Sequence, residues 1–390
     1  LAVLCLALVI SGSHWLLGRN ESPSPSKLRF NLFRIPLVMR CVRHDAFPFA
    51  VQLLSISLFL VIILAGLFAN QRHNIAPVLT WTWWWALLIF VVLFMGKFFC
   101  MICPWEGLTS LVTSLSPFSR KSRMGLNLSW PSKLRNVYPA LGLFILLTWI
   151  ELGFDVTSSG TTTAILGFGM LFLAIICAIL FEKRSFCRYL CPVGRISGIY
   201  ALFSPLELRA KSATVCADCS SKDCLMGNSQ HRGCPMFLNP ATLRENTYCT
   251  LCTECVRTCP SQNISLAVRP FATDLFAKNR FRMDEAVLIV TLLALTSFHG
   301  ITMTPYWTRV NQLIRVETGL EATVIFTLLM GMILFGQVAL FWLGSRWSSR
   351  LAPNGLSVSK IFKAFSYCVL PIALFYHLAH NSMHFFMEAQ

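Results

Sequence analysis

The chain contains few charged residues: Asp, Glu, Lys and Arg together make up 13% of its 390 residues, and only 17 residues are acidic. Hydrophobic residues make up 55%, and the mean hydropathy is +0.62. So low a charge content excludes an ordinary soluble domain and indicates a protein with several membrane spans. The sequence also contains no recognisable nucleotide-binding or quinone-binding motif, so we expect it to need partners for any catalysis.

Long apolar runs hold most of the hydrophobic residues. Most runs approach the roughly 20 residues that a helix needs to cross the hydrocarbon core of a membrane. We therefore expect an all-α polytopic membrane protein with about eight transmembrane helices. The first run starts without a Met, and we interpret it as a shortened span, with the remainder of a signal-like segment as the alternative. The expected spans are 1–17, 52–69, 78–96, 137–153, 164–182, 284–303, 320–343 and 361–387.

The basic residues are concentrated in every second loop between these spans. This distribution is a signal of membrane topology, so the formal net charge of +16 does not indicate a nucleic-acid partner. The alternate loops hold three basic residues, namely Arg72, Arg309 and Arg315. By the positive-inside rule, the loops rich in Lys and Arg face the cytoplasm. We expect a multi-pass protein of a bacterial inner membrane, in contact with lipid. The other 30 of the 33 basic residues lie in the loops at 18–51, 97–136, 183–283 and 344–363.

Eight of the 16 cysteines lie within 44 residues of the segment 206–283, which we call the insert. The spacing Cys-x2-Cys-x2-Cys-x3-Cys-Pro is typical of [4Fe–4S] ligands, and in two-cluster ferredoxins its fourth cysteine binds the other cluster. Following that pattern, we expect two ferredoxin-like clusters in the insert. Structural zinc is the alternative, because paired cysteines also bind it. The first insert set is Cys216, Cys219, Cys224 and Cys259, and the second insert set is Cys249, Cys252, Cys255 and Cys234.

Four further cysteines lie in two similar Cys-Pro motifs that follow two apolar hairpins. Each motif is followed by a Ser-Pro pair at the same distance. Such a duplication predicts a parallel repeat, which would place both motifs at one membrane depth. We expect their four thiolates to hold a third iron–sulfur cluster, with reduced thiols or a transient thiol pair as the alternative. This membrane-edge set is Cys100, Cys103, Cys187 and Cys191.

The two Cys-Pro hairpin ends, combined with the cysteines of the insert, resemble the membrane polyferredoxin family of NapH-, NosR- and CcoG-like proteins. The resemblance covers about residues 50–270. It implies electron transfer at the membrane, often between a quinol and a periplasmic enzyme. It also implies an alternative, an accessory factor that reduces a metal ion for an oxidase. A redox-sensing membrane regulator is a third interpretation.

The last spans carry histidines. His377, His380 and His384 have the spacing i, i+3, i+7 of one helical face, and His299 lies near the end of an earlier span. Imidazoles inside a membrane are costly and are usually functional. We expect haem b between His299 and His380, with His377 as the next choice of ligand. A hydrogen-bonded histidine cluster or a quinone site is the alternative.

These patterns divide the chain into four parts. The N-terminal span and basic loop occupy 1–50, the repeated hairpins 51–205, the insert 206–283 and the histidine-bearing spans 284–390. A hydrocarbon core ~30 Å thick separates the insert from any outer partner, so we expect relays between them. The predicted function is a subunit of a respiratory complex. It would pass electrons between its clusters, a quinone or haem, and a periplasmic cytochrome or oxidoreductase.

Overall fold

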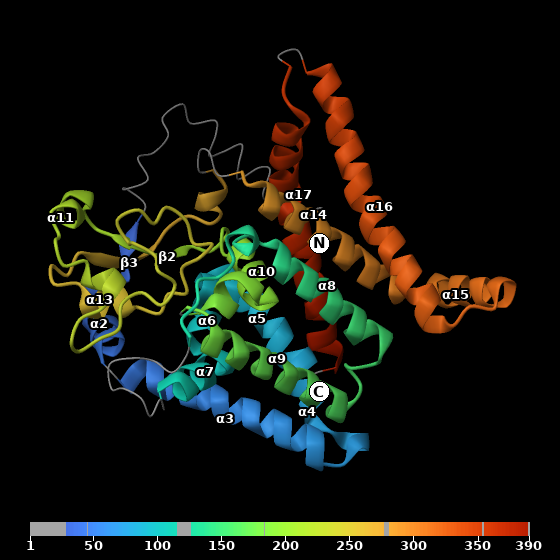
Figure 1. Ribbon diagram of the computed structural model, residues 1–390, viewed down its shortest axis with the longest axis horizontal. Helices are drawn as coiled ribbons and strands as arrows, with labels where there is room; N and C mark the ends of the chain where they lie inside the picture. The colour runs from blue at the N-terminus through green and yellow to red at the C-terminus, as the bar shows by residue number, and fades with distance from the viewer. Residues whose placement is uncertain are drawn as a thin grey trace. The chain divides into compact units, whose positions relative to one another are not determined.

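The computed structural model describes residues 29–44, 46–114, 126–182, 184–276, 281–352 and 355–388. The described chain is mostly helical (Figure 1), and six of its helices are long and apolar enough to cross a membrane. The predicted multi-pass membrane class is thereby confirmed, whereas the expected span 1–17 lies outside the described residues. The six helical segments are Ala46–Phe68, Gln71–Thr113, Gly160–Leu180, Met283–Thr302, Ala322–Leu351 and Val358–Met387.

The chain divides into two compact units, and the first, which we call the cysteine unit, comprises residues 20–135 and 159–277. In this unit α3 (Ala46–Phe68) packs against α9 (Gly160–Leu180). Gly66 is required at their crossing, because a Cβ there would lie 2.6 Å from the carbonyl oxygen of Gly160. The other α-helices of this unit are α2 (Pro36–Arg43), α4 (Ile75–Pro77), α5 (Trp85–Met95), α6 (Phe99–Ile102), α7 (Pro104–Ser114), α10 (Pro192–Tyr200), α11 (Ala213–Ala217), α12 (Asp223–Met226) and α13 (Glu254–Thr258).

Both Cys-Pro motifs are corners at which one helical segment ends and the next begins. Cys103 separates α6 from α7, and Cys191 separates the π-helix Phe186–Leu190 from α10. The two cysteines have similar extended backbones, with φ −59° and ψ 128° at Cys103 and φ −66° and ψ 116° at Cys191. A following proline disfavours helical dihedrals at the residue before it, which explains both corners. The two repeats thus share their local geometry.

The insert contains a small antiparallel sheet, which an all-α fold does not include. Its strands are β1 (Phe30–Asn31), β2 (Leu206–Ala210) and β3 (Ile264–Val268), in the order β1-β3-β2. Leu206 pairs with Val268, and Ala210 pairs with Ile264. Strand β1 comes from the segment before the first described span, so this segment is part of the structure around the insert. The apolar core beneath the sheet is small and includes Phe33, Val42, Leu208, Val256 and Leu266.

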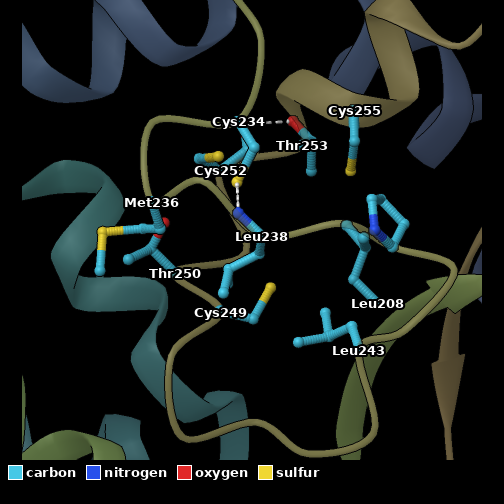
Figure 2. Close-up of a pocket in the computed structure, with 11 residues that line it drawn as sticks. Leu208, Cys234, Met236, Leu238, Leu243, Cys249, Thr250, Cys252, Thr253 and Cys255 are labelled. Carbon is cyan, nitrogen blue, oxygen red and sulfur yellow. Dashed lines mark hydrogen bonds between the residues drawn. The ribbon is translucent and has the colours of Figure 1, made fainter. Parts of the chain in front are cut away.

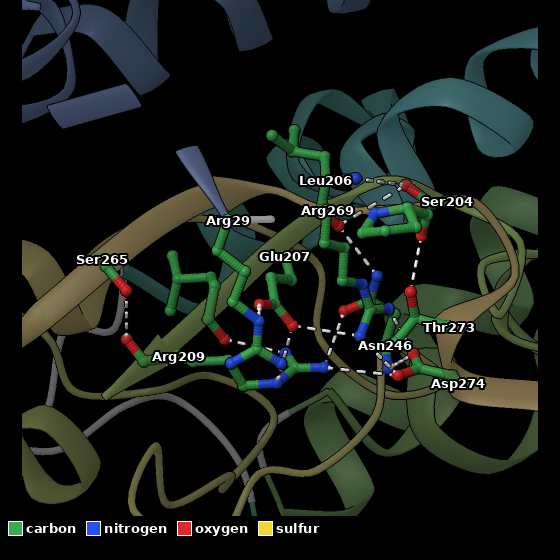
Figure 3. Close-up of polar contacts among 12 residues, drawn as sticks. Arg29, Ser204, Leu206, Glu207, Arg209, Asn246, Ser265, Arg269, Thr273 and Asp274 are labelled. Carbon is green, nitrogen blue, oxygen red and sulfur yellow. Dashed lines mark hydrogen bonds and ion pairs between the residues drawn. The ribbon is translucent and has the colours of Figure 1, made fainter. Parts of the chain in front are cut away.

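A buried network of charged side chains joins the sheet to the loop that precedes Cys249 (Figure 3). Arg269 donates to Asp274 over 2.6 and 2.7 Å and to Glu207 over 3.0 Å. Asp274 accepts the backbone N–H of Asn246 at 2.8 Å. The Asn246 side chain in turn donates to the carbonyl oxygen of Leu206. Because buried charges are tolerated only when they are paired, this network fixes the cysteine loop against the sheet.

The second compact unit, which we call the histidine unit, comprises residues 136–158 and 278–390 apart from those that are not described. Helix α14 is buried along most of its length and packs against α8, α15, α16 and α17. Gly300 permits the close approach of α14 and α17, because a Cβ there would lie 2.1 Å from the Tyr376 hydroxyl. The helices of this unit are α8 (Tyr138–Gly153), α14 (Met283–Thr302), α15 (Pro305–Thr318), α16 (Ala322–Leu351) and α17 (Val358–Glu388).

Two features of these helices differ from the sequence-based expectation. Helix α8 corresponds to the expected span 137–153, but with 16 residues it is shorter than the six candidate spans. Helix α15 occupies a segment that we expected to be an outer loop, and its side chains are mostly exposed. Trp307 attaches this helix to the core through edge-on ring contacts with Phe298 and Phe326.

Candidate metal centres

The first insert set lines a single pocket. Cys216 lies on α11, Cys224 on α12, and Cys259 at the C-terminal end of α13. Lys222, with a φ of 46°, provides the turn in the wider gap between the second and third cysteines. All four cysteines of the set contribute to the lining. The structure therefore brings Cys259 to the first three cysteines, as the crossed pattern expects.

Asn263 donates two hydrogen bonds to sulfur atoms of this set. Its side-chain amide donates to Cys216 Sγ at 3.2 Å, and its backbone N–H donates to Cys259 Sγ at 3.3 Å. Burial raises the pKa of the Cys224 thiol to about 11, and the neighbouring thiols of Cys259 and Cys216 act in the same direction. Hydrogen bonds to sulfur orient groups that can bind a metal, so Asn263 holds two sulfur atoms of this set in place.

The second insert set also lines one pocket, into which the side chains of its cysteines project (Figure 2). Cys234, Cys249, Cys252 and Cys255 all contribute to the lining. Positive φ angles of 52° at Leu251 and 60° at Thr253, on either side of Cys252, make the turn tight. The backbone N–H of Leu238 donates to Cys234 Sγ at 3.3 Å. The surrounding wall is apolar, and Met236 and Leu243 also line the pocket.

The thiols of the second set are costly to ionise without a metal. Burial raises the pKa of Cys252 to about 12, and the positive charge of Arg184 partly offsets this shift. Burial also raises the pKa of Cys255, with Cys252, Cys249 and Cys234 adding to the effect. A metal ligand must be a thiolate, so a metal bound at this site would have to offset the cost of ionising its cysteines with its own positive charge.

The structure brings the membrane-edge set together from its two repeats. Burial raises the pKa of Cys191 to about 12, which the Gly194 N–H opposes by donating to its Sγ at 3.3 Å, while Cys100 raises it further. The pKa of Cys187 is raised by burial, by Glu106, and by Cys191 and Cys103. Each of the four cysteines is thus close enough to at least two of the others for their charges to interact.

Three charged residues lie near these corners that the sequence analysis did not predict as part of the site. Glu106 accepts from Arg184 Nε at 2.5 Å, and the two form a buried ion pair next to Cys187. Lys97 is buried beside the same corner. The sequence contains a signal for two of them, since a basic residue stands three positions before the first cysteine of each motif, Lys97 before Cys100 and Arg184 before Cys187.

A polar cavity of about 360 Å³ lies where the membrane-edge set and the second insert set approach each other. Met101, Glu106 and Arg184 line it on the side of the corners, and Cys252 and Glu254 line it on the side of the insert. Burial raises the pKa of Glu254, an effect that Arg257 opposes. The cavity is large enough to admit water or a small polar solute beside Cys252.

The histidines form a separate group in the histidine unit. The ring centroids of His299 and His380 are 5.1 Å apart, and those of His380 and His384 are 4.8 Å apart. His377 is buried on the same helix, with its carbonyl oxygen accepting from Asn381. Two histidine nitrogens that bind one metal ion from opposite sides lie ~4 Å apart, at bond lengths of ~2.0 Å. Because each ring centre lies further from the metal than its nitrogen, the two ring centroids are then separated by clearly more than that distance. Rings at this separation must move apart to hold a haem iron, so haem ligation stays a prediction.

No protein-family model and no solved structure matches the chain. Over 88 residues it is 34% identical to the putative electron transport protein YccM of Escherichia coli, which covers 22% of each protein. Over 175 residues it is 27% identical to the uncharacterized protein MJ0749 of Methanocaldococcus jannaschii, covering 44% of this chain and 65% of that one. The chain spans about a fifth of the first relative and just under two thirds of the second. Over part of its length, therefore, the chain is similar to a protein named for electron transport.

Proposed function

We propose that the protein is a membrane-bound iron–sulfur electron-transfer protein in which each insert set holds one [4Fe–4S] cluster. The observation that carries this proposal is that each expected set of four cysteines lines one pocket, with Cys259 and Cys234 exchanged between the two motifs. A cubane takes one thiolate at each of four irons. A single zinc ion instead needs ligands that converge on one point, and no three His, Cys, Asp or Glu of the described residues do so.

The membrane-edge set is proposed to hold a third iron–sulfur cluster. Its four thiols come from two equivalent corners and interact electrostatically, and Cys191 is buried while the other three are partly buried. Cys224 of the first insert set acts on Cys255 of the second, and Arg184 acts on both Cys252 and Cys187. This chain of neighbours supports an electron path from the first insert set through the second to the membrane-edge set.

The other end of the path is proposed to lie at the histidines, with haem b or a quinone as the carrier. The distribution of Lys and Arg favours an inner-membrane protein with its insert in the cytoplasm. The partner would be a periplasmic cytochrome or oxidoreductase of a respiratory complex. The similarity to YccM supports electron transport in general terms and names no partner.

A second candidate is an accessory factor that reduces a metal ion for an oxidase. The observation that favours it is the polar cavity beside Cys252, in which Glu106 and Glu254 offer carboxylate oxygens. Stable co-purification with a cytochrome or an oxidoreductase subunit would favour the respiratory complex. Reduction of an added metal ion by the isolated, reduced protein would favour the accessory factor.

The decisive experiment is a dithionite-reduced minus oxidised optical spectrum of the anaerobically purified full chain, with iron and acid-labile sulfide measured on the same sample. A broad bleach with matching iron and sulfide is expected for the clusters. Sharp b-type bands over that bleach would add the haem. A sample that contains zinc in place of iron and sulfide would contradict the proposed function.

A further inference from the structure

Lys97 is buried inside the protein without a carboxylate beside it. The residue lies in the turn Gly96–Phe98 between α5 and α6, and only 2% of it is exposed. No carboxylate among the described residues lies within ion-pair distance of its ammonium group. Removing an ammonium ion from water costs several kcal/mol unless an anion compensates it. An anion is therefore expected next to Lys97.

The charged neighbours of Lys97 identify the place of that anion. Three of them are cysteines of the membrane-edge set, namely Cys100, Cys187 and Cys191, and the fourth is Arg195. Arg195 is also buried and its Nε–H has no hydrogen-bond partner, although its guanidinium lies over the ring of Tyr248. Two buried cations thus lie near each other, and the second cation makes the need for negative charge beside Lys97 greater.

The equivalent residue of the other repeat is in a different electrostatic state. Arg184 stands three positions before Cys187, as Lys97 stands before Cys100, but Glu106 neutralises it across 2.5 Å. The repeat therefore places one compensated and one uncompensated cation beside the same four cysteines. The charge that remains to act on a group bound by these cysteines is therefore that of Lys97, and Arg195 lies near Lys97.

We propose that Lys97 is the counter-ion of an iron–sulfur cluster held by the membrane-edge set and that its charge raises the reduction potential of this cluster. The inference rests on the proposed function. A thiolate-ligated cluster is an anion, and reduction adds one further negative charge, which a nearby cation stabilises. The strongest interactions of Lys97 with cysteines are those with Cys100, Cys187 and Cys191 of the membrane-edge set, and its interaction with Cys249 of the second insert set is weaker.

This asymmetry biases the direction of electron flow. When one electron leaves the second insert cluster, that cluster is oxidised and the membrane-edge cluster is reduced. The ammonium of Lys97 stabilises the product of this step more than its reactant. Lys97 thus acts only through its charge on the reduction potential of the cluster, and it neither binds iron nor supplies a proton.

The test is an EPR-monitored redox titration of the full chain, in which the signal lost in Cys187→Ala identifies the membrane-edge cluster. In Lys97→Met we expect unchanged iron content and an at least tenfold smaller equilibrium constant for reduction, which is about 59 mV for one electron. Lys97→Arg should restore most of the potential. Lys360→Met, which removes an exposed lysine of α17, is the matched control and should leave the potential unchanged.

The outcomes separate the inference from the proposed function. An unchanged potential in an iron-loaded Lys97→Met variant would overturn the role of Lys97 and leave the cluster in place. If that variant loses its iron, Lys97→Gln, which removes the charge but keeps a polar side chain, provides the same measurement, and an unchanged potential there overturns the inference. A wild-type protein without any signal that depends on Cys187 would instead refute the third cluster.

Discussion

The cysteine unit and the histidine unit bury their polar groups in different ways. In the cysteine unit, buried charges form networks, as at Arg269, Glu207 and Asp274, or face thiols, as at Lys97. In the histidine unit, α14 is surrounded by apolar helix surfaces, and buried Glu285 accepts the hydroxyl of Tyr367 from α17. The helices of the histidine unit form their backbone hydrogen bonds within each helix. The cysteine loops form theirs in turns and between loops, as between Cys234 N–H and the Cys224 carbonyl oxygen.

This difference indicates what each unit needs in order to fold. The loops of the insert bury little apolar surface, so under the proposed function the free energy of metal binding supplies much of their stability. The histidine unit has an extended apolar core around Leu295, Phe298 and Met330. We therefore expect the stability of the cysteine unit to depend on the clusters that it binds, and the stability of the histidine unit to be independent of those clusters.

Removing all iron should give the largest effect. After anaerobic treatment with a strong iron chelator, we expect the amides of the insert to exchange rapidly with deuterium. The reason is that the eight thiols would no longer be joined through shared clusters. The amides of α14 should keep their protection. Hydrogen exchange followed by mass spectrometry makes this comparison. Equal loss of protection in both units would remove the distinction between them.

Cys252→Ala should remove one cluster and unfold much of the insert. Cys252 lies at the centre of the tight turn, and its loss leaves the second insert set with three ligands. Iron and sulfide should fall by the content of one cluster. Cys368→Ala, which changes an exposed cysteine of α17, is the matched control and should retain all iron. An unchanged iron content in the Cys252 variant would contradict the assignment of the second insert set as the ligands of one cluster.

Arg269→Met should destabilise the insert by roughly 3–5 kcal/mol, because it leaves Glu207 and Asp274 buried without their main partner. The loop before Cys249 should then lose protection first, since Asn246 is held by Asp274. Denaturant titration of the reduced protein measures the change. Replacing the exposed Arg72 by Met is the control, and an equal loss in both variants would show that the network does not stabilise the insert.

Gly300→Ala should have the smallest effect and should be confined to the histidine unit. The added Cβ meets the Tyr376 hydroxyl, and overpacking of this kind costs about 1 kcal/mol when the end of a side chain can move. The midpoint of thermal unfolding should fall slightly, with unchanged iron content. Tyr376→Phe in the same chain should restore it. A loss of iron would show that the two units are coupled.

Much of this molecule could be predicted because its signals are local in the sequence. Apolar runs predicted the helices α3, α5, α8, α9, α14, α16 and α17, since the length of a span is fixed by the bilayer. The Cys-Pro pairs predicted both corners, because proline restricts the residue before it. The strand pairing of residues 30–31 with 267–268 and the exposed helix α15 had no comparable signal, since a strand of two residues has no periodicity.

The sequence by itself determined which residues could be ligands and which segments could be spans, because spacing along the chain sets both. The tertiary structure alone decided which charges surround those ligands. Lys97, Glu106 and Arg184 come from separate segments, and their burial beside the cysteines depends on how α6, α7 and the second corner pack. Electrostatic energy depends on distance and burial in space, and neither quantity can be read from positions along a chain.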